Sequence, residues 1–269
     1  MYHPLLVFDG DTDQLITAVL RPGNAHGSRL VVLVVRCLVR RPRQAWPGIP
    51  IEVRADSGCV VPRLTAWWED HDVAFTVGLI PNPRLEALAA PLLGAAQAQS
   101  AAEGGAKVRL AGEAPDQAGS WPRPRRVVFK AEVLAQGPNT RFVVTSRPDP
   151  PLAVYDWYVD RGEAENWIKD DKSALAADRL SDHRFWANQF RLLLHAAAYW
   201  LLDTPRGWLG ATAAAHFQFD PLRLRLLKVG GRVWELVGRV RLALAASHPG
   251  EPLWHYLAAR PGRPVNNPG

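Results

Sequence analysis

One short segment gathers an unusual set of polar side chains. Residues 155–172 read YDWYVDRGEAENWIKDDK. In a helix, with about 100° between successive residues, five of them fall within about 80° of one another. This stripe consists of Tyr158, Arg161, Glu165, Lys169 and Lys172. It is either a solvated face with i,i+4 ion pairs or a cluster of charged groups with a chemical role.

A second candidate is Asp56. It directly follows the short segment Ile51–Ala55, which we expect to be a strand, and it opens the sequence Asp-Ser-Gly. Folds that alternate strands and helices usually place function at the carboxyl ends of strands. The same three residues also form ordinary turns, so the position alone leaves both interpretations open.

The composition bounds what the chain can be. Its 269 residues carry a formal charge of +6, and residues 179–269 hold 12 Lys and Arg against 5 Asp and Glu. A basic balance favours a polyanionic partner. The apolar runs are too short to span a membrane, and no signal peptide is visible. Cys37 and Cys59 are too few for a disulfide framework. We expect reduced core thiols in a cytoplasmic protein.

The order of predicted elements indicates an α/β fold. Residues 1–80 alternate strands, at 5–8, 15–20, 51–55 and 73–79, with helices, at 29–40 after a Ser28 cap and at 62–70. Residues 81–150 read as a helix followed by a β-rich insertion. Residues 151–210 return to the core with the polar stripe and a helix at 182–203 that ends at Pro205. Residues 211–269 read as a basic helical region.

The spacing Tyr-x2-Arg-x3-Glu-x6-Lys from Tyr158 to Lys172 resembles the signature helix of DDE insertion-sequence transposases, in their Tyr-Arg-Glu-Lys branch. The segment Arg54–Gly58 resembles the surroundings of the second Asp of that family. Further similar segments are Tyr2–Leu5, Leu20–His26, Asn139–Thr145 and Asn188–Leu192, so the resemblance covers most of the chain.

This resemblance implies an RNase H-like core and metal-dependent cleavage and strand transfer of DNA during transposition and recombination. Asp56 and Glu165 would be catalytic and would bind Mg²⁺ or Mn²⁺, two ions in the intact family site. Tyr158, Arg161, Lys169 and Lys172 would bind DNA phosphates. The partners implied are double-stranded DNA, as transposon ends and target, and a second copy in a synaptic complex. The place of action would be the bacterial cytoplasm, at the nucleoid.

The chain departs from the family at one point. The first catalytic Asp lies on a strand upstream of the segment that resembles Tyr2–Leu5, so we expect an N-terminal truncation that leaves the chain inactive alone. Asp9, Asp11 and Asp13 lie in a predicted hairpin turn, where turn chemistry is their usual role. The alternatives are a non-catalytic remnant that binds DNA or a partner transposase and, from another class, an Asp/Glu glycosidase. The cations beside Glu165 disfavour the glycosidase.

Overall fold

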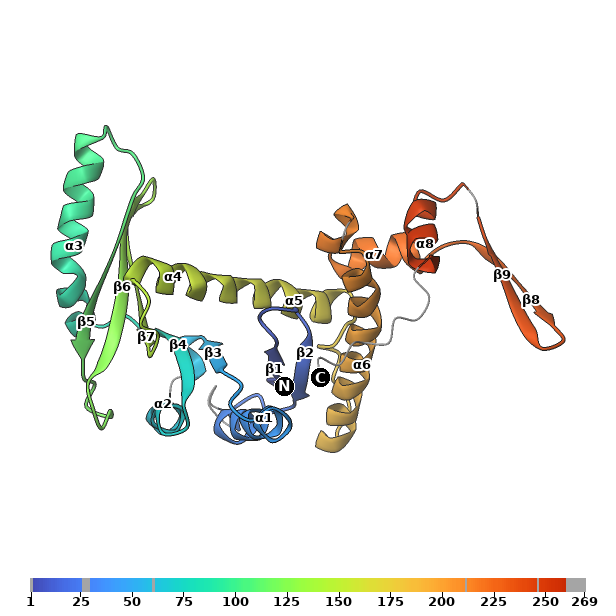
Figure 1. The fold of residues 1–269 in the computed structure, drawn as a ribbon, viewed down its shortest axis with the longest axis horizontal. Helices are drawn as coiled ribbons and strands as arrows, with labels where there is room; N and C mark the ends of the chain where they lie inside the picture. Colours follow the sequence, from blue (N-terminus) through green and yellow to red (C-terminus); the bar gives the residue numbers. More distant parts are fainter. Residues whose placement is uncertain (1, 26–29, 60, 211, 246, 260–269) are drawn as a thin grey trace. The chain divides into compact units, whose positions relative to one another are not determined.

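The computed structural model describes residues 2–25, 30–59, 61–210, 212–245 and 247–259 (Figure 1). The chain divides into two compact units. Unit 1 is Gly23–Glu163, and unit 2 combines Tyr2–Pro22 with Ala164–Gly269. Unit 1 is thus built from one stretch of chain, whereas unit 2 needs both ends of the sequence.

Unit 1 is organised around a five-stranded sheet in the order β3-β4-β7-β6-β5. The strands are β3 (Ile51–Ala55), β4 (Val73–Leu79), β5 (Val108–Asp116), β6 (Arg125–Leu134) and β7 (Gly137–Thr145). β3 and β4 are parallel and are joined through α2 (Pro62–Glu69), while all other pairs are antiparallel. The predicted insertion therefore continues the same sheet as β3 and β4.

Three further helices belong to unit 1: α1 (Val31–Ala45), α3 (Pro83–Ala102) and α4 (Pro151–Val159). The side chain of Asn82 caps α3 by accepting bonds from the N–H groups of Arg84 and Leu85, each at 3.1 Å. α4 packs on the sheet because its Val154 and Tyr155 join a buried cluster with Val128 and Val143. This packing fixes the first part of the polar stripe against the strands.

Unit 2 contains a hairpin, β1 (Leu5–Phe8) and β2 (Leu15–Val19), which pairs separately from the larger sheet. Its helices are α5 (Glu163–Ser173), α6 (Phe185–Trp208), α7 (Phe219–Leu226) and α8 (Glu251–Ala258). Gln189 of α6 accepts a bond from the Leu20 N–H at 2.7 Å and donates one to the Ala18 carbonyl at 3.3 Å. The hairpin is thereby joined to a core that includes Leu15, Leu192, Tyr199 and Phe219.

The structure confirms the mixed α/β class and most of the predicted elements, with three corrections in the helices. α1 does not end at Arg40 but continues through Pro42 to Ala45. α6 does not end before Pro205 but continues to Trp208. Because Pro205 has no backbone N–H, the carbonyl of Leu201 loses its helical hydrogen bond. Leu201 is 75% exposed, so water can bind this carbonyl instead. The segment 155–172 is not one α-helix, because the 3₁₀ turn η2 (Asp160–Gly162) separates α4 from α5.

The predicted helical region at 211–269 also needs correction. Residues 231–244 form a hairpin of β8 (Gly231–Leu236) and β9 (Arg239–Leu244) between α7 and α8. Gly238, at φ 76°, takes the left-handed conformation that the turn requires. Cys37 is exposed and is not a core thiol. The side chain of Cys59 and the predicted cap at Ser28 lie outside the described part of the chain.

Candidate metal and DNA-binding site

The polar stripe is shared between the two units. Tyr158, at the end of α4, and Arg161, in the 3₁₀ turn, belong to unit 1. Glu165, Lys169 and Lys172 lie on α5 in unit 2. The predicted site therefore consists of two groups of side chains, each held by its own unit.

In unit 1 the Tyr158 hydroxyl meets the segment around Asp56. It accepts a bond from the backbone N–H of Gly78 in β4 and one from the Arg161 guanidinium. A Cβ atom on Gly78 would lie 2.4 Å from this hydroxyl oxygen and 3.5 Å from the Ser57 nitrogen. Only a glycine at position 78 leaves room for such an approach.

The pKa of the Tyr158 phenol reflects the same neighbours, Asp56, Arg161 and Gly78. Burial raises the pKa of its phenol above the ordinary value, and the negative charge of Asp56 raises it further. The charge and hydrogen bond of Arg161 and the Gly78 N–H oppose this rise. The phenol stays protonated at neutral pH, so it can donate a hydrogen bond to an anion beside Asp56.

Asp56 follows β3 and precedes the 3₁₀ turn η1 (Ser57–Cys59). Its side chain is exposed, so its oxygens are accessible from solvent. The neighbouring Arg54 binds the Trp157 carbonyl at 2.8 Å and stacks on the Trp157 ring, 4.5 Å from its centroid. Arg147 lies over the same ring, also at 4.5 Å. These contacts connect β3 to α4 and hold the surroundings of Asp56.

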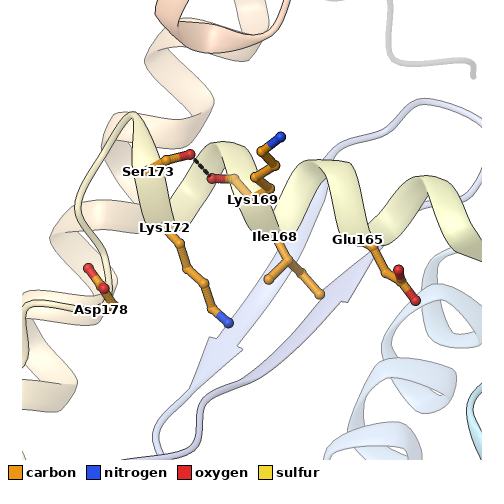
Figure 2. A pocket seen from close by; sticks show the side chains of 6 residues that line it. All are labelled: Glu165, Ile168, Lys169, Lys172, Ser173 and Asp178. Atoms are coloured by element: carbon orange, nitrogen blue, oxygen red, sulfur yellow. Dashed lines mark hydrogen bonds between the residues drawn. The ribbon is translucent and has the colours of Figure 1, made fainter.

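In unit 2, α5 lines a hollow of about 460 Å³. The residues around it are Glu165, Ile168, Lys169, Lys172, Ser173 and Asp178. Figure 2 shows Glu165, Ile168 and Lys172 on the same side of the helix, whereas Lys169 leaves it in another direction. The Ser173 hydroxyl binds the Lys169 carbonyl, which ties down the last turn of α5. Two carboxylates, those of Glu165 and Asp178, and two lysine side chains thus line one solvent-accessible hollow.

The C-terminal turn of α5 is held by buried charges. Asp170 accepts a bond from the Phe219 N–H at 3.1 Å and lies 3.7 Å from the Arg206 guanidinium, which also binds Asp203 at 2.5 Å. Burial raises the pKa of Asp170 and of Asp203, partly offset by the charge of Arg206. This network fixes α5 against α6 and α7.

The Asp171 carboxylate is also buried, but no comparable network of hydrogen bonds and ion pairs offsets the loss of its hydration. Its side chain is 2% exposed, and its Oδ1 atom has no hydrogen-bond partner among the described residues. Burial raises its pKa from 3.8 to about 6, and nearby Asp178 adds to the rise while Lys172 opposes it. The residue next to a predicted phosphate ligand is therefore a destabilised carboxylate.

The structure brings Asp56, Tyr158 and Arg161 together in unit 1, and Glu165, Lys169 and Lys172 around one hollow in unit 2. The convergence of Asp56 with Glu165 stays a prediction. Within the described ranges, no three His, Cys, Asp or Glu side chains come close enough to hold a metal ion.

The three aspartates of the first hairpin turn serve turn chemistry. The Asp9 carboxylate accepts bonds from the Asp11 N–H at 3.2 Å and from the Thr12 hydroxyl at 2.6 Å. Asp13 has a left-handed backbone at φ 64°, and its N–H binds the Asp9 carbonyl. Both oxygens of Asp9 are thus occupied by the turn itself.

Two parts of the site do not follow from the polar stripe. Gly78 was missed, although a glycine inside an otherwise β-branched strand signals close approach by another group. The network of Asp170, Asp203 and Arg206 was also missed, because it joins helices that are distant in sequence.

Residues 1–262 match the family model described as Transposase DDE domain group 1. The chain belongs to the DDE transposases. The match includes Asp56, Glu165 and the whole polar stripe, and it supports a transposase function with DNA as substrate. None of the curated proteins compared with the chain matches it.

Membership in the DDE transposase family bears on the predicted metal cofactor, and the helices bear on a membrane location. DDE transposase domains generally use divalent metal ions, and exposed carboxylates such as Asp56 and Glu165 offer the oxygen ligands that such ions prefer. In the described part of this transposase, no helix is both long and apolar enough to cross a membrane.

Proposed function

We propose that the chain is an insertion-sequence transposase of the Tyr-Arg-Glu-Lys branch, with an RNase H-like core, acting on transposon ends and target DNA. The observation that carries this proposal is the meeting of two separate motifs in unit 1. The hydroxyl of Tyr158, from the signature segment, lies close to Asp56 and Ser57, from the other motif. Separated by about a hundred residues, such motifs converge when they serve one site.

Asp56 and Glu165 would hold the divalent metal ions. Both side chains are exposed hard-oxygen donors, and Asp56 lies at the carboxyl end of a strand. When bound, Mg²⁺ or Mn²⁺ ions supply charge neutralisation and Lewis-acid activation at a DNA phosphate. The two carboxylates bind and orient these ions, and their negative charge sets the affinity.

The cations and the phenol would hold the DNA backbone. Arg161 offers a planar fork to a phosphate, whereas Lys169 and Lys172 act as point charges at the hollow beside Glu165. The Tyr158 phenol, kept protonated by its raised pKa, donates a further hydrogen bond. Each unit would thus contribute phosphate contacts of its own to the strand to be cut.

We further propose that the chain does not cleave or join DNA alone. Of the family's three carboxylates, the resemblance assigns two to this chain, Asp56 and Glu165, and the described ranges contain no group of three His, Cys, Asp or Glu residues that could hold a metal ion. Two carboxylates offset less of the charge of two divalent ions than the three of the family site, and they fix the ions less well. Our second candidate function rests on the same observation: a non-catalytic protein that binds DNA or a partner transposase.

Metal binding tests the first part of the proposal directly. Mn²⁺ binding, followed by electron paramagnetic resonance, should weaken about tenfold or more in Asp56→Asn and in Glu165→Gln. The matched control is Glu86→Gln, which removes an exposed carboxylate from the first turn of α3. Equal affinity in all four proteins would refute the assignment of both ligands.

Activity separates the two candidate functions. Nicking of a supercoiled plasmid with Mg²⁺ should be absent for this chain and present in an extended chain whose added upstream strand carries an Asp. Glu165→Gln in the extended protein should abolish the nicking again. An inactive extended chain that still binds DNA would favour the non-catalytic function. Strong nicking by the chain as given would refute the proposal that it is inactive alone.

A further inference from the structure

The β8–β9 hairpin stands apart from the core of unit 2. Figure 1 shows it extending from the neighbouring helices α7 and α8. Every residue of β8 is exposed, and Val237 at the turn is fully so. A two-stranded ribbon without a packed face gains no stability from burial, so its exposed side chains call for a partner.

The two faces of the ribbon differ in character. Because successive residues of a strand point to opposite faces, the register Trp234↔Arg241 and Leu236↔Arg239 sorts the side chains. One face carries Arg232, Trp234, Leu236, Arg239 and Arg241, and we call it the arginine face. The other carries Val233, Glu235, Val240 and Leu244. Three of the four charged residues are cations, and all three lie on one face.

The arginine face is arranged around its aromatic residue. The Arg232 guanidinium carbon lies 5.4 Å from the centroid of the Trp234 ring, and that of Arg241 lies 5.9 Å from it. These contacts hold two cations side by side on the ring. None of the three arginines forms an ion pair with another residue in the described ranges. Their charges are therefore directed at solvent or at a ligand.

We propose that the arginine face of the β8–β9 hairpin is a binding surface for duplex DNA, separate from the phosphate contacts of α5. Three cations on one face of a ribbon complement the negative charge of a phosphate backbone, and arginine forms bidentate bonds with phosphates. A two-stranded ribbon also fits the major groove of B-DNA. This inference rests on the proposed function, which makes DNA the polyanion at hand.

The salt dependence of binding tests the surface. Each phosphate contact contributes about 0.9 to the slope of log affinity against log salt concentration. For the full chain and a duplex of arbitrary sequence, R239Q/R241Q should lower this slope by about 1.8. The variant R239K/R241K, which keeps both charges, should retain the slope of the unmodified chain.

A control removes the same net charge elsewhere. Arg40 and Arg41 of α1 are exposed, so R40Q/R41Q matches the charge loss without changing the hairpin. An unchanged slope in R239Q/R241Q, or an equal loss in the control, would overturn the proposal. A full chain that does not bind duplex at all would overturn the proposed function as well, so the two failures are distinguishable.

A variant on the face opposite the arginine face tests whether the hairpin is instead an interface between copies of the chain. V233S/V240S changes two side chains that are 62% and 67% exposed and leaves every charge in place. The DNA slope and the oligomeric state, measured by sedimentation, should both stay unchanged. If this variant lost DNA binding together with self-association, the hairpin would be an interface between copies and the arginine-face proposal would be wrong.

Discussion

Replacing Asp171 by asparagine removes a buried carboxylate from the C-terminal turn of α5 and keeps its shape. The pKa of Asp171 rises from 3.8 to about 6 on folding, and each pKa unit corresponds to about 1.4 kcal/mol. The ionised carboxylate therefore costs about 3 kcal/mol of the free energy of unfolding at neutral pH. Asp171→Asn should recover up to that amount, because the amide carries no charge to desolvate.

The sign of the pH dependence follows from the raised pKa. Below pH 4 the carboxyl is protonated in both folded and unfolded chains, so the charge penalty is absent. Between pH 4 and pH 6 the folded chain holds a proton that the unfolded chain has lost, and stability falls as the pH rises. Above pH 6 the full penalty applies. The advantage of the variant should therefore grow from near zero at pH 4 to its maximum at pH 7.

Hydrogen exchange measures this locally, which suits a chain of two units. The N–H groups of Ala174 and Ala177, bonded to the Asp170 and Asp171 carbonyls, report on the turn that contains the substitution. The control is Glu163→Gln, since Glu163 is an exposed carboxylate at the other end of α5 and does not contribute to the pKa shift of Asp171. If Asp171→Asn were no more stable than the unmodified chain at pH 7, the carboxylate would have a compensating partner and the reasoning would fail.

Three further predictions follow from the contacts. Arg161→Ala and Lys172→Ala should each reduce the salt slope of duplex binding by about one; an unaltered slope in both would remove their phosphate role. Gly78→Ala places a Cβ 2.4 Å from the Tyr158 hydroxyl and should lower the free energy of unfolding in urea by about 1–3 kcal/mol. The same substitution should cost less in a Tyr158→Phe background, and an equal cost in both backgrounds would contradict the close approach. Arg125, 2% exposed at its side chain, binds both oxygens of Glu69, so Arg125→Met should destabilise unit 1 by about 3 kcal/mol in thermal unfolding, and a neutral result would refute that pairing.

The strands of unit 1 were predictable where composition is decisive. Ile51–Ala55 and Val73–Leu79 are rich in β-branched and aromatic residues, and Asp or Pro residues bound them, so their limits match the structure. The pairing of β4 with β7 was not predictable, because Thr76 and Thr145 are joined across a long stretch of chain. Local patterns do not encode sheet order.

The errors in the C-terminal half also have physical causes. Residues 223–244 are basic and amphipathic, which favoured a helix, but Val237-Gly238 supplies the two-residue turn of a hairpin. At Pro205 the usual rule for helix ends failed because the proline lies near the end of α6, where Arg206 pairs with Asp203.

The residues and motifs of the candidate site are predictions from the sequence, whereas their division between two units was not predictable from it. The stripe from Tyr158 to Lys172 was expected on one helix, yet the 3₁₀ turn and the division after Glu163 separate its members. Such a division depends on which core each half joins, and that is decided by packing partners far away in the sequence.

Unit 2 combines two stretches of chain that are far apart in the sequence, and this affects the order in which the two units can fold during synthesis. The hairpin β1–β2 is synthesised before its hydrogen-bond partners Gln189 and Tyr199, which follow 169 and 186 residues after the positions that they bind. At about 5–20 residues per second, the ribosome needs on the order of ten to thirty seconds to supply them. During that interval unit 1 can complete its contiguous fold while Leu15 and Leu20 still lack their core. Chaperone dependence should therefore concentrate on the segment Leu5–Leu20 of the nascent chain.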